Sequence, residues 1–213
     1  MTQQREIRVV VVDDHLMVRK GVEMVLRSDD MAVVGVAERV AEARALVERR
    51  LPDVALVDVG LAEGDCGVEL ASAIATEVPQ VRVLLYTGGA SDPDLLRRAV
   101  KSGAAGLALK AGSPGELLEA VRSVANGGSY FDPRLSKLLK DDSPEPKQTV
   151  LSARECEVLT LLGHGLNGEQ IAAELVLSPE TIRTHVRNAM GKLQANTRVH
   201  ALALALQGDE IEL

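Results

Sequence analysis

Short apolar runs alternate with segments of helical spacing along the first 127 residues of the chain. The runs are rich in β-branched residues, nearly continuous in apolar character, and bounded by polar or turn residues. Strands that are buried on both faces of a parallel sheet have this pattern. There are five such runs, at residues 9–12, 32–36, 54–57, 81–85 and 106–109.

The segments that follow these runs place apolar residues three and four positions apart, which favours amphipathic helices. In one of them, Leu95, Leu96, Ala99 and Val100 share a face, and Ser91-Asp92-Pro93 before it is a typical helix start. Strict alternation of strand and helix predicts an α/β fold. We expect a (βα)5 doubly wound parallel sheet with right-handed crossovers, ending near residue 127.

The pattern changes twice after that point. Residues 128–149 are poor in apolar residues and contain charges and prolines, so we expect a linker, with a small docking turn at Tyr130–Pro133. Residues 150–213 show only helical signals, including a capping box from Ser152 to Glu155 and a cap followed by proline at Ser178-Pro179. The expected organisation is a domain at 1–127, a linker at 128–149 and an all-α four-helix domain at 150–213.

Composition narrows the class of protein. Of 213 residues, 46% are hydrophobic and 26% charged, which is typical of a globular chain, whereas 1% aromatic residues argue against stacking platforms for single-stranded bases. The net charge of −7 argues against non-specific binding to polyanions. Cys66 and Cys156 form no metal motif, and no stretch suggests a leader or a membrane span, so we expect a cytoplasmic protein without a membrane partner.

Each predicted strand end in the first domain except the second carries a chemically useful residue. Asp13 and Asp14 end the first strand, Asp58 the third, Thr87 the fourth and Lys110 the fifth. In a doubly wound sheet these ends share one edge, where ligands bind. Three converging carboxylates favour a hard cation such as Mg²⁺, and Lys110 suits a phosphoryl oxygen. Asp58 could then act as a nucleophile toward phosphorus.

This set of residues resembles the receiver domain of bacterial two-component response regulators, which has a flavodoxin-like fold. The resemblance implies that Asp58 is the phosphoacceptor and that Asp13, Asp14, Asp58 and the backbone carbonyl of Gly60 hold Mg²⁺. It further implies that Thr87, Gly88 and Lys110 contact the phosphoryl group.

The chain departs from the receiver pattern at two places. The loop after Asp58 lacks the usual Met-Pro, and its glycine comes one position late, at Gly67. Leu107 stands where the family often has an aromatic residue that moves inward on phosphorylation. Leucine has no polar tip, so we expect this switching route to be altered.

The helical half contains the segments Leu151–Leu159, Gly165–Asn167 and Leu177–Val186, followed by Lys192-Leu193. They resemble the LuxR-type helix-turn-helix output domain of NarL/FixJ response regulators, which implies DNA as a partner. The residues expected to face DNA lie on the third helix of this domain: Thr181, Arg183, Thr184, Arg187, Asn188 and Lys192. Arg183 and Arg187 are one turn apart and could reach a single groove.

Residues 150–213 carry five basic and eight acidic residues, an unusual balance for a DNA-binding domain. Few phosphates can be neutralised by so few cations, so one copy should bind weakly and a homodimer on paired half-sites is expected when the protein is active. The last helix, with Leu202, Leu204 and Leu206, could supply the dimer surface or pack under the third helix.

The functional prediction is a response regulator whose phosphorylation on Asp58 by a sensor histidine kinase controls dimerisation and sequence-specific DNA binding. Two alternatives stay open. Leu107 and the unusual loop suggest a phospho-independent regulator. A Mg²⁺-dependent phosphatase or phosphotransferase would use the same aspartate, but Gly60 occupies the position where such an enzyme needs an acid or base, so we do not expect an enzyme.

Overall fold

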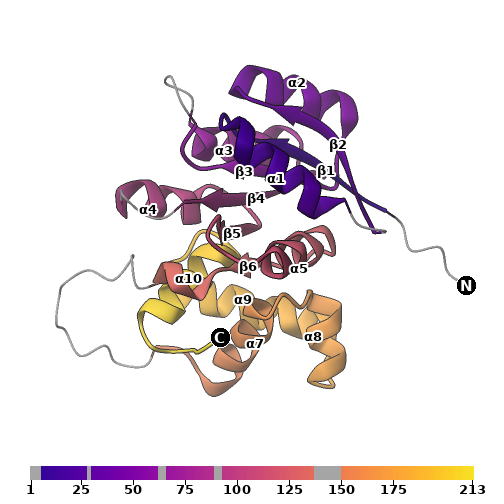
Figure 1. Ribbon diagram of the computed structural model, residues 1–213. Helices are drawn as coiled ribbons and strands as arrows, with labels where there is room; N and C mark the ends of the chain where they lie inside the picture. The colour runs from indigo at the N-terminus through magenta and orange to yellow at the C-terminus, as the bar shows by residue number, and fades with distance from the viewer. Residues whose placement is uncertain (1–5, 28–29, 62–65, 89–92, 137–149) are drawn as a thin grey trace, which may run out of the picture.

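A computed structural model describes residues 6–27, 30–61, 66–88, 93–136 and 150–213. The chain forms an N-terminal part in which helices surround a sheet and a C-terminal part made of helices (Figure 1). The predicted start of a helix at Ser91-Asp92 and most of the predicted linker lie outside the described residues.

The sheet is parallel throughout and has the strand order β2-β1-β3-β4-β5-β6. Strands β1, β3 and β4 are buried nearly end to end, because helices cover both faces of the sheet. This confirms the doubly wound α/β fold. The strands are β1 (Ile7–Val12), β2 (Met31–Ala37), β3 (Val54–Asp58), β4 (Arg82–Thr87), β5 (Gly106–Leu109) and β6 (Tyr130–Phe131).

Five helices cover the sheet in two groups. Helices α1 (Leu16–Leu26) and α5 (Pro114–Ala125) pack together on one face, over a cluster that includes Val22, Val121 and Val124. The other face is covered by α2 (Val40–Arg50), α3 (Gly67–Glu77) and α4 (Pro93–Lys101). Every crossover between neighbouring parallel strands therefore contains a helix, as the alternating pattern predicted.

The sixth strand was not predicted from the sequence. Leu107 of β5 pairs with Phe131 of β6, and the Asp132 amide donates a 2.9 Å hydrogen bond to the Leu107 carbonyl. A 3₁₀ turn, η1 (Pro133–Leu135), follows and buries Leu135. The predicted docking turn is thus an added sheet edge, and ordered structure continues beyond residue 127.

The C-terminal part contains α7 (Ala153–Gly163), α8 (Gly168–Glu174), α9 (Pro179–Lys192) and α10 (Arg198–Gln207). Each helix begins after a side-chain cap, because Ser152, Asn167, Ser178 and Thr197 all accept a hydrogen bond from a backbone N–H of the first turn. The capping box predicted at Ser152 and Glu155 is present. The four expected helices are therefore confirmed.

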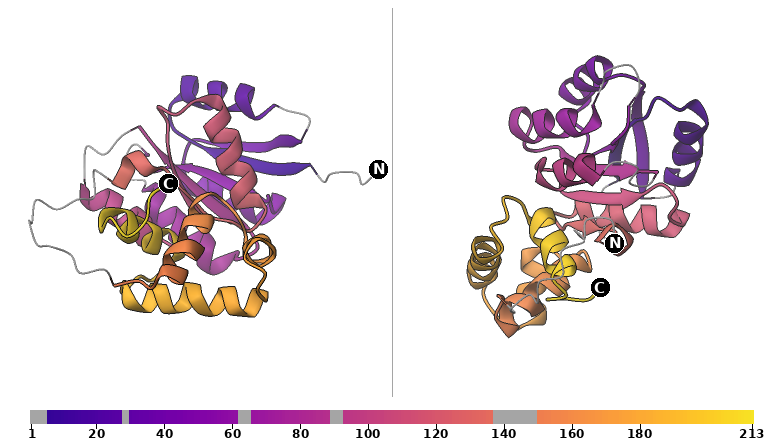
Figure 2. Two further views of the ribbon diagram at one scale, coloured as in Figure 1. Left: turned by 90° about the horizontal axis from the view of Figure 1, so that it is seen from below. Right: turned by 90° about the vertical axis from the view of Figure 1, so that its left-hand side faces the viewer.

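The two parts pack against each other through α10, which contacts α4 and β6, and through α7, which contacts β6. The Thr197 hydroxyl donates to the Val100 carbonyl (2.7 Å), and the Asn167 amide donates to the Asn126 carbonyl (2.9 Å). A continuous hydrophobic cluster crosses this boundary. Helix α9 lies at the outer edge of the molecule, away from the sheet (Figure 2). Across the described residues, none of the helices is both long and apolar enough to span a bilayer.

Candidate phosphoacceptor site and DNA-binding helix

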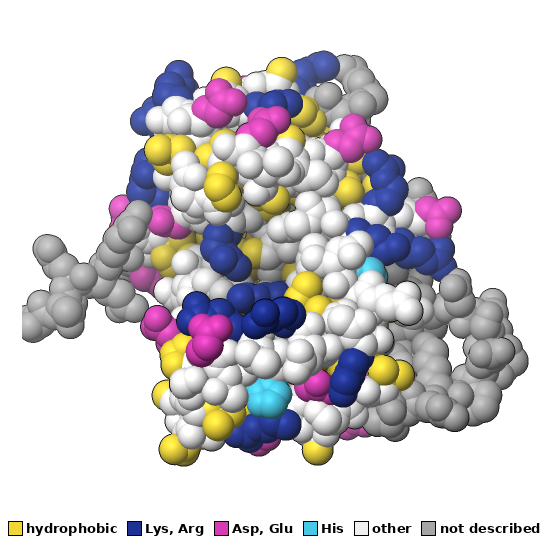
Figure 3. Space-filling view, turned by 180° about the vertical axis from the view of Figure 1, so that it is seen from behind, with side chains coloured by type: hydrophobic (Ala, Val, Ile, Leu, Met, Phe, Trp, Pro, Cys, Tyr) yellow, Lys and Arg dark blue, Asp and Glu magenta, His cyan; other side chains and the backbone are white. Residues whose placement is uncertain are grey.

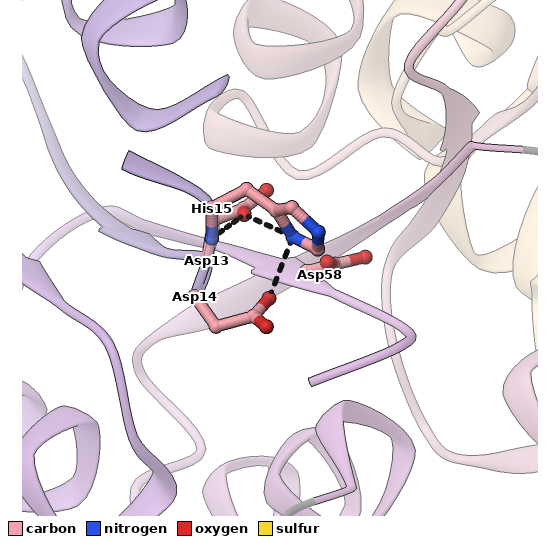
Figure 4. A group of neighbouring side chains, drawn as sticks. All are labelled: Asp13, Asp14, His15 and Asp58. Atoms are coloured by element: carbon pink, nitrogen blue, oxygen red, sulfur yellow. Dashed lines mark hydrogen bonds and ion pairs between the residues drawn. The ribbon is translucent and has the colours of Figure 1, made fainter. Parts of the chain in front are cut away.

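The carboxyl edge of the sheet gathers the acidic residues that the strand ends predicted. Asp13 follows β1 and Asp58 is the last residue of β3, and both are buried. Asp14 is half-buried beside them, and His15 lies at the start of α1 (Figure 4). Carboxylate and imidazole atoms of these four residues lie within 4.8 Å of one another. The structure therefore brings together residues far apart in the sequence.

Lys110 links two of these carboxylates. Its Nζ lies 2.7 Å from Asp13 Oδ2 and 2.7 Å from Asp58 Oδ2, and its side chain is only 17% exposed. The Lys110 backbone N–H donates to the Thr87 carbonyl (2.7 Å), which ties the end of β5 to the end of β4. The single ammonium group thus offsets part of the repulsion between two buried carboxylates.

Asp13 is held by donors on both oxygens. Oδ1 accepts the His15 N–H at 2.8 Å, while Oδ2 accepts the hydroxyl of Tyr86 as well as the Lys110 ammonium. Burial raises the pKa of Asp13, but these hydrogen bonds outweigh it and leave the pKa below its ordinary value. Burial and the Asp13 hydrogen bond raise the pKa of Tyr86, so its phenol remains a donor. Asp13 is therefore a fixed anion.

The donor set suits a hard divalent cation. Asp13, Asp14 and Asp58 offer oxygens at one place, with one ammonium group bonded to two of the three carboxylates. Gly60 lies next to the site, where its N–H donates to Asp58 Oδ1 (3.2 Å). The chemistry of these residues fits a site for a metal ion with oxygen ligands.

The junction between β3 and α3 is unusually close. A Cβ atom placed on Gly67 would lie 1.7 Å from the Asp58 carbonyl oxygen, so only glycine fits at this first residue of α3. The late glycine noted in the sequence is thus required by the path of the chain behind Asp58. Residues 62–65, including Glu63 and Asp65, lie outside the described residues.

The remaining residues predicted for phosphoryl contact also lie at this edge. Thr87 ends β4 and is buried, and Gly88 follows it and is exposed. Leu107 is fully buried in β5, between β4 and β6. A nonpolar side chain enclosed in this way has no polar group to exchange between core and water, and an altered switching route stays a prediction.

Helix α9 presents one buried and one exposed face. Ile182, Val186 and Ala189 are buried against the neighbouring helices. The exposed face carries the residues predicted to meet DNA, namely Arg183, Thr184, Arg187 and Asn188. The Arg183 guanidinium forms an ion pair with Glu180 (2.9 Å), and both groups are exposed. Such a surface ion pair contributes little free energy, so Arg183 can leave Glu180 for another anion at little cost. The predicted amphipathicity of α9 is confirmed.

Four of the six predicted DNA-facing residues have side-chain contacts within the chain: Arg183 as described, Thr184, whose hydroxyl donates to the Glu180 carbonyl (3.0 Å), Thr181 and Lys192. The Thr181 hydroxyl lies 2.9 Å from Ser178 Oγ at the helix cap. Lys192 Nζ lies 2.6 Å from Glu155 Oε2, so its ammonium group links α9 to α7. On the face shown in Figure 3, Lys and Arg side chains gather across the middle of the molecule with acidic side chains beside them. Acidic groups therefore lie among the basic groups on this face.

Leu202 and Leu206 of α10 are buried and Leu204 is half-buried, all in the hydrophobic cluster. Their burial agrees with packing inside the molecule, which was one of the two roles considered for these leucines.

Sequence reasoning missed Tyr86. Its position as the last residue but one of β4, opposite Asp58 in the sheet register, places it below the acidic residues. The signal was present: one of only two tyrosines in the chain directly precedes Thr87 at a predicted strand end. Strand alternation alone did not show which polar group its hydroxyl would meet.

A cluster of carboxylates with a lysine at the carboxyl edge of a doubly wound sheet, followed by a helix-turn-helix unit, defines the class of DNA-binding response regulators. Residues 9–122 match the family described as "Response regulator receiver domain", and residues 149–205 match "Bacterial regulatory proteins, luxR family". The chain belongs to the NarL/FixJ family of two-component response regulators and is a transcription regulator.

Relatives match along nearly the whole chain. A "Probable transcriptional regulatory protein NarL" of Mycobacterium tuberculosis is 37% identical over 209 residues, covering 96% of both chains. The "Oxygen regulatory protein NreC" of Staphylococcus carnosus is 31% identical and covers 94% of this chain and 97% of its own. Among solved structures, the response regulator ChrA of a heme-sensing two-component system is 31% identical with a TM-score of 0.55, covering 96% of this chain and 98% of its own.

Proposed function

We propose that Asp58 accepts a phosphoryl group from a sensor histidine kinase and that this modification controls DNA binding by α9. The observation that carries the proposal is the bridge from Lys110 to both Asp13 and Asp58 at 2.7 Å, within the cluster of carboxylates at the edge of the sheet. An Asp58 oxygen attacks phosphorus, a P–O bond forms, and the bond to the donor nitrogen breaks with its electron pair.

Mg²⁺ is the proposed cation, held by Asp13, Asp14, Asp58 and the Gly60 carbonyl. When bound, it supplies positive charge to the phosphoryl oxygens. Lys110, freed from one of its carboxylates, contacts the same phosphoryl group together with Thr87 and the Gly88 backbone N–H. The acyl phosphate carries a charge of about −1.5 to −2 in place of the single charge of the carboxylate, and its oxygens need new hydrogen-bond donors.

On the DNA side, we propose that Arg183, Thr184, Arg187 and Asn188 contact the duplex, with Thr181 and Lys192 closer to the backbone. A solved relative carries the description "Structure of the two-component response regulator RcsB-DNA complex", at 25% identity and a TM-score of 0.58. Because basic residues are few, we infer that a homodimer on paired half-sites is the binding species, in the cytoplasm where the DNA lies.

The test uses the full chain with Mg²⁺ and a small acyl phosphate donor. Intact-mass analysis should show one added phosphoryl group on the wild type and none on Asp58→Asn. Duplexes selected from a random library with the phosphorylated protein should bind less tightly to the Asp58→Asn variant. Equal phosphoryl gain by both proteins would remove Asp58 from the proposal, whereas equal DNA affinity with and without donor would favour phospho-independent control.

Loss of DNA contact is tested separately. Arg187→Ala should weaken binding to the selected duplex by about 1–3 kcal/mol while leaving phosphorylation unchanged, since Arg187 lies on α9, far from the sheet edge. The matched control is Arg154→Ala, whose guanidinium instead contacts Glu157 and the Leu175 carbonyl within the domain. Full DNA affinity in Arg187→Ala would exclude this residue from the interface.

A further inference from the structure

Tyr86 lies directly beneath the acidic residues and is 2% exposed. It occupies the penultimate position of β4, and its neighbour in the sheet register is Asp58. A buried phenol needs a partner for its hydroxyl, and here that partner is a carboxylate of the site rather than a backbone group.

The side chain makes two contacts with the site. Its hydroxyl donates to Asp13 Oδ2, and Lys110 Nζ lies over its ring, 4.8 Å from the ring centroid. Tyr86 therefore touches both groups that flank Asp58. The attraction between the ammonium and the ring adds to the hydrogen bond, because Lys110 Nζ itself bonds to Asp13 Oδ2.

The two oxygens of Asp13 are consequently not equivalent. Oδ2 is engaged by Tyr86 and Lys110, while Oδ1 accepts the His15 backbone N–H and lies 3.5 Å from the His15 imidazole Nδ1. When Lys110 turns toward a phosphoryl group, the hydroxyl of Tyr86 is the side-chain donor that stays on Oδ2. Without it, a buried carboxylate oxygen would lose its fixed partner.

We propose that Tyr86 is a positioning residue that orients the Asp13 carboxylate for cation binding and keeps it oriented after Lys110 has moved. The inference rests on the proposed function of the site and adds a residue to it. Partners that orient the ligands of a metal site commonly change metal affinity by about 10–100-fold when removed.

The test compares Tyr86→Phe with Tyr130→Phe. Both changes remove one hydroxyl and keep the ring, but Tyr130 lies on β6, at the opposite edge of β5 from β4. Calorimetric titration of the unphosphorylated full chain with Mg²⁺ should give about tenfold weaker binding for Tyr86→Phe and wild-type affinity for Tyr130→Phe. Equal Mg²⁺ affinity in Tyr86→Phe and wild type would overturn the role of Tyr86.

A second readout does not depend on the stability of Tyr86→Phe. The chain has two tyrosines and no tryptophan, so Tyr86 is the only intrinsic fluorophore of that kind in Tyr130→Phe. Mg²⁺ should change its emission with a saturable dependence that matches calorimetry, and Asp13→Asn in the same background should abolish the change. Constant emission while calorimetry records binding would overturn the proposal. A wild type that takes no Mg²⁺ would instead refute the proposed metal site itself.

Discussion

Replacing Gly67 by alanine is the sharpest test of the fold around Asp58. The added Cβ would lie 1.7 Å from the Asp58 carbonyl oxygen, 2.8 Å from its carbonyl carbon and 3.3 Å from Val57 Cγ1. All but the last are backbone atoms of a buried central strand, so no side-chain rotation relieves the clash. Ordinary contact would require α3 to move more than about 1 Å away from β3, and overpacking of this kind costs about 1–3 kcal/mol or more.

We expect a loss of about 3 kcal/mol in the free energy of unfolding, since the clash is with backbone. For a chain of this size, that corresponds to a melting temperature lower by about 6–12 °C, measured by circular dichroism. The displacement also moves Asp58, so the phosphoryl gain from a small donor should fall.

The matched control is Gly168→Ala. Gly168 is likewise the first residue of a helix, α8, but a Cβ atom there meets nothing within 4 Å. Its melting temperature should stay within about 2 °C of the wild type, because surface substitutions usually change stability by less than about 0.5 kcal/mol. A Gly67→Ala protein as stable as Gly168→Ala would refute the close junction of β3 and α3.

Two further predictions concern the output domain. Burial raises the pKa of Glu155, but Lys192 and the Ser152 N–H and hydroxyl outweigh it and lower the pKa from 4.5 to about 2. The lowered pKa stabilises the folded protein by about 2–3 kcal/mol, allowing for the partial exposure of Lys192. This stabilisation is present above pH 4.5 and is lost as the pH falls toward 2. In urea titrations, Glu155→Gln should therefore be less stable than the wild type at pH 7 and should lose less stability on acidification. Val176 has φ +54° and is 90% exposed, so its backbone is strained while its side chain makes little contact. Val176→Gly should therefore raise the melting temperature by about 2–4 °C. A lower melting temperature in this variant would contradict the backbone strain.

The sequence predicted the fold well where local pattern and tertiary environment agree. Central strands are buried on both faces, so their apolar runs are continuous, and the helix starts carry side-chain caps that act locally. Strand β6 contains only two residues, Tyr130 and Phe131, which is too short for any periodicity. It forms because Leu107 offers an unpaired strand edge next to it, a property of the assembled sheet.

The site was predictable to the extent that strand ends in a parallel sheet share an edge. That rule places Asp13, Asp58, Thr87 and Lys110 together from the sequence alone. It did not show that Lys110 bridges two carboxylates or that Tyr86 bonds Asp13, because such contacts depend on side-chain rotamers and on the twist of the sheet. Lys192 likewise looked available for DNA, since its partner Glu155 lies 37 residues away.

The packing of the two domains bears on how a signal could reach DNA. Helix α10 rests on α4 and β6, and α9 makes its extensive contacts with α7, α8 and α10 rather than with the described elements of the receiver. The face with Arg183 and Arg187 is therefore exposed while the domains are docked. Phosphorylation can change DNA affinity only if it stabilises one conformation or assembly of the protein more than another, and if the two bind DNA differently. Because α9 is already uncovered, this arrangement favours a difference other than its release, which agrees with our proposal that phosphorylation acts on the pairing of two chains on DNA.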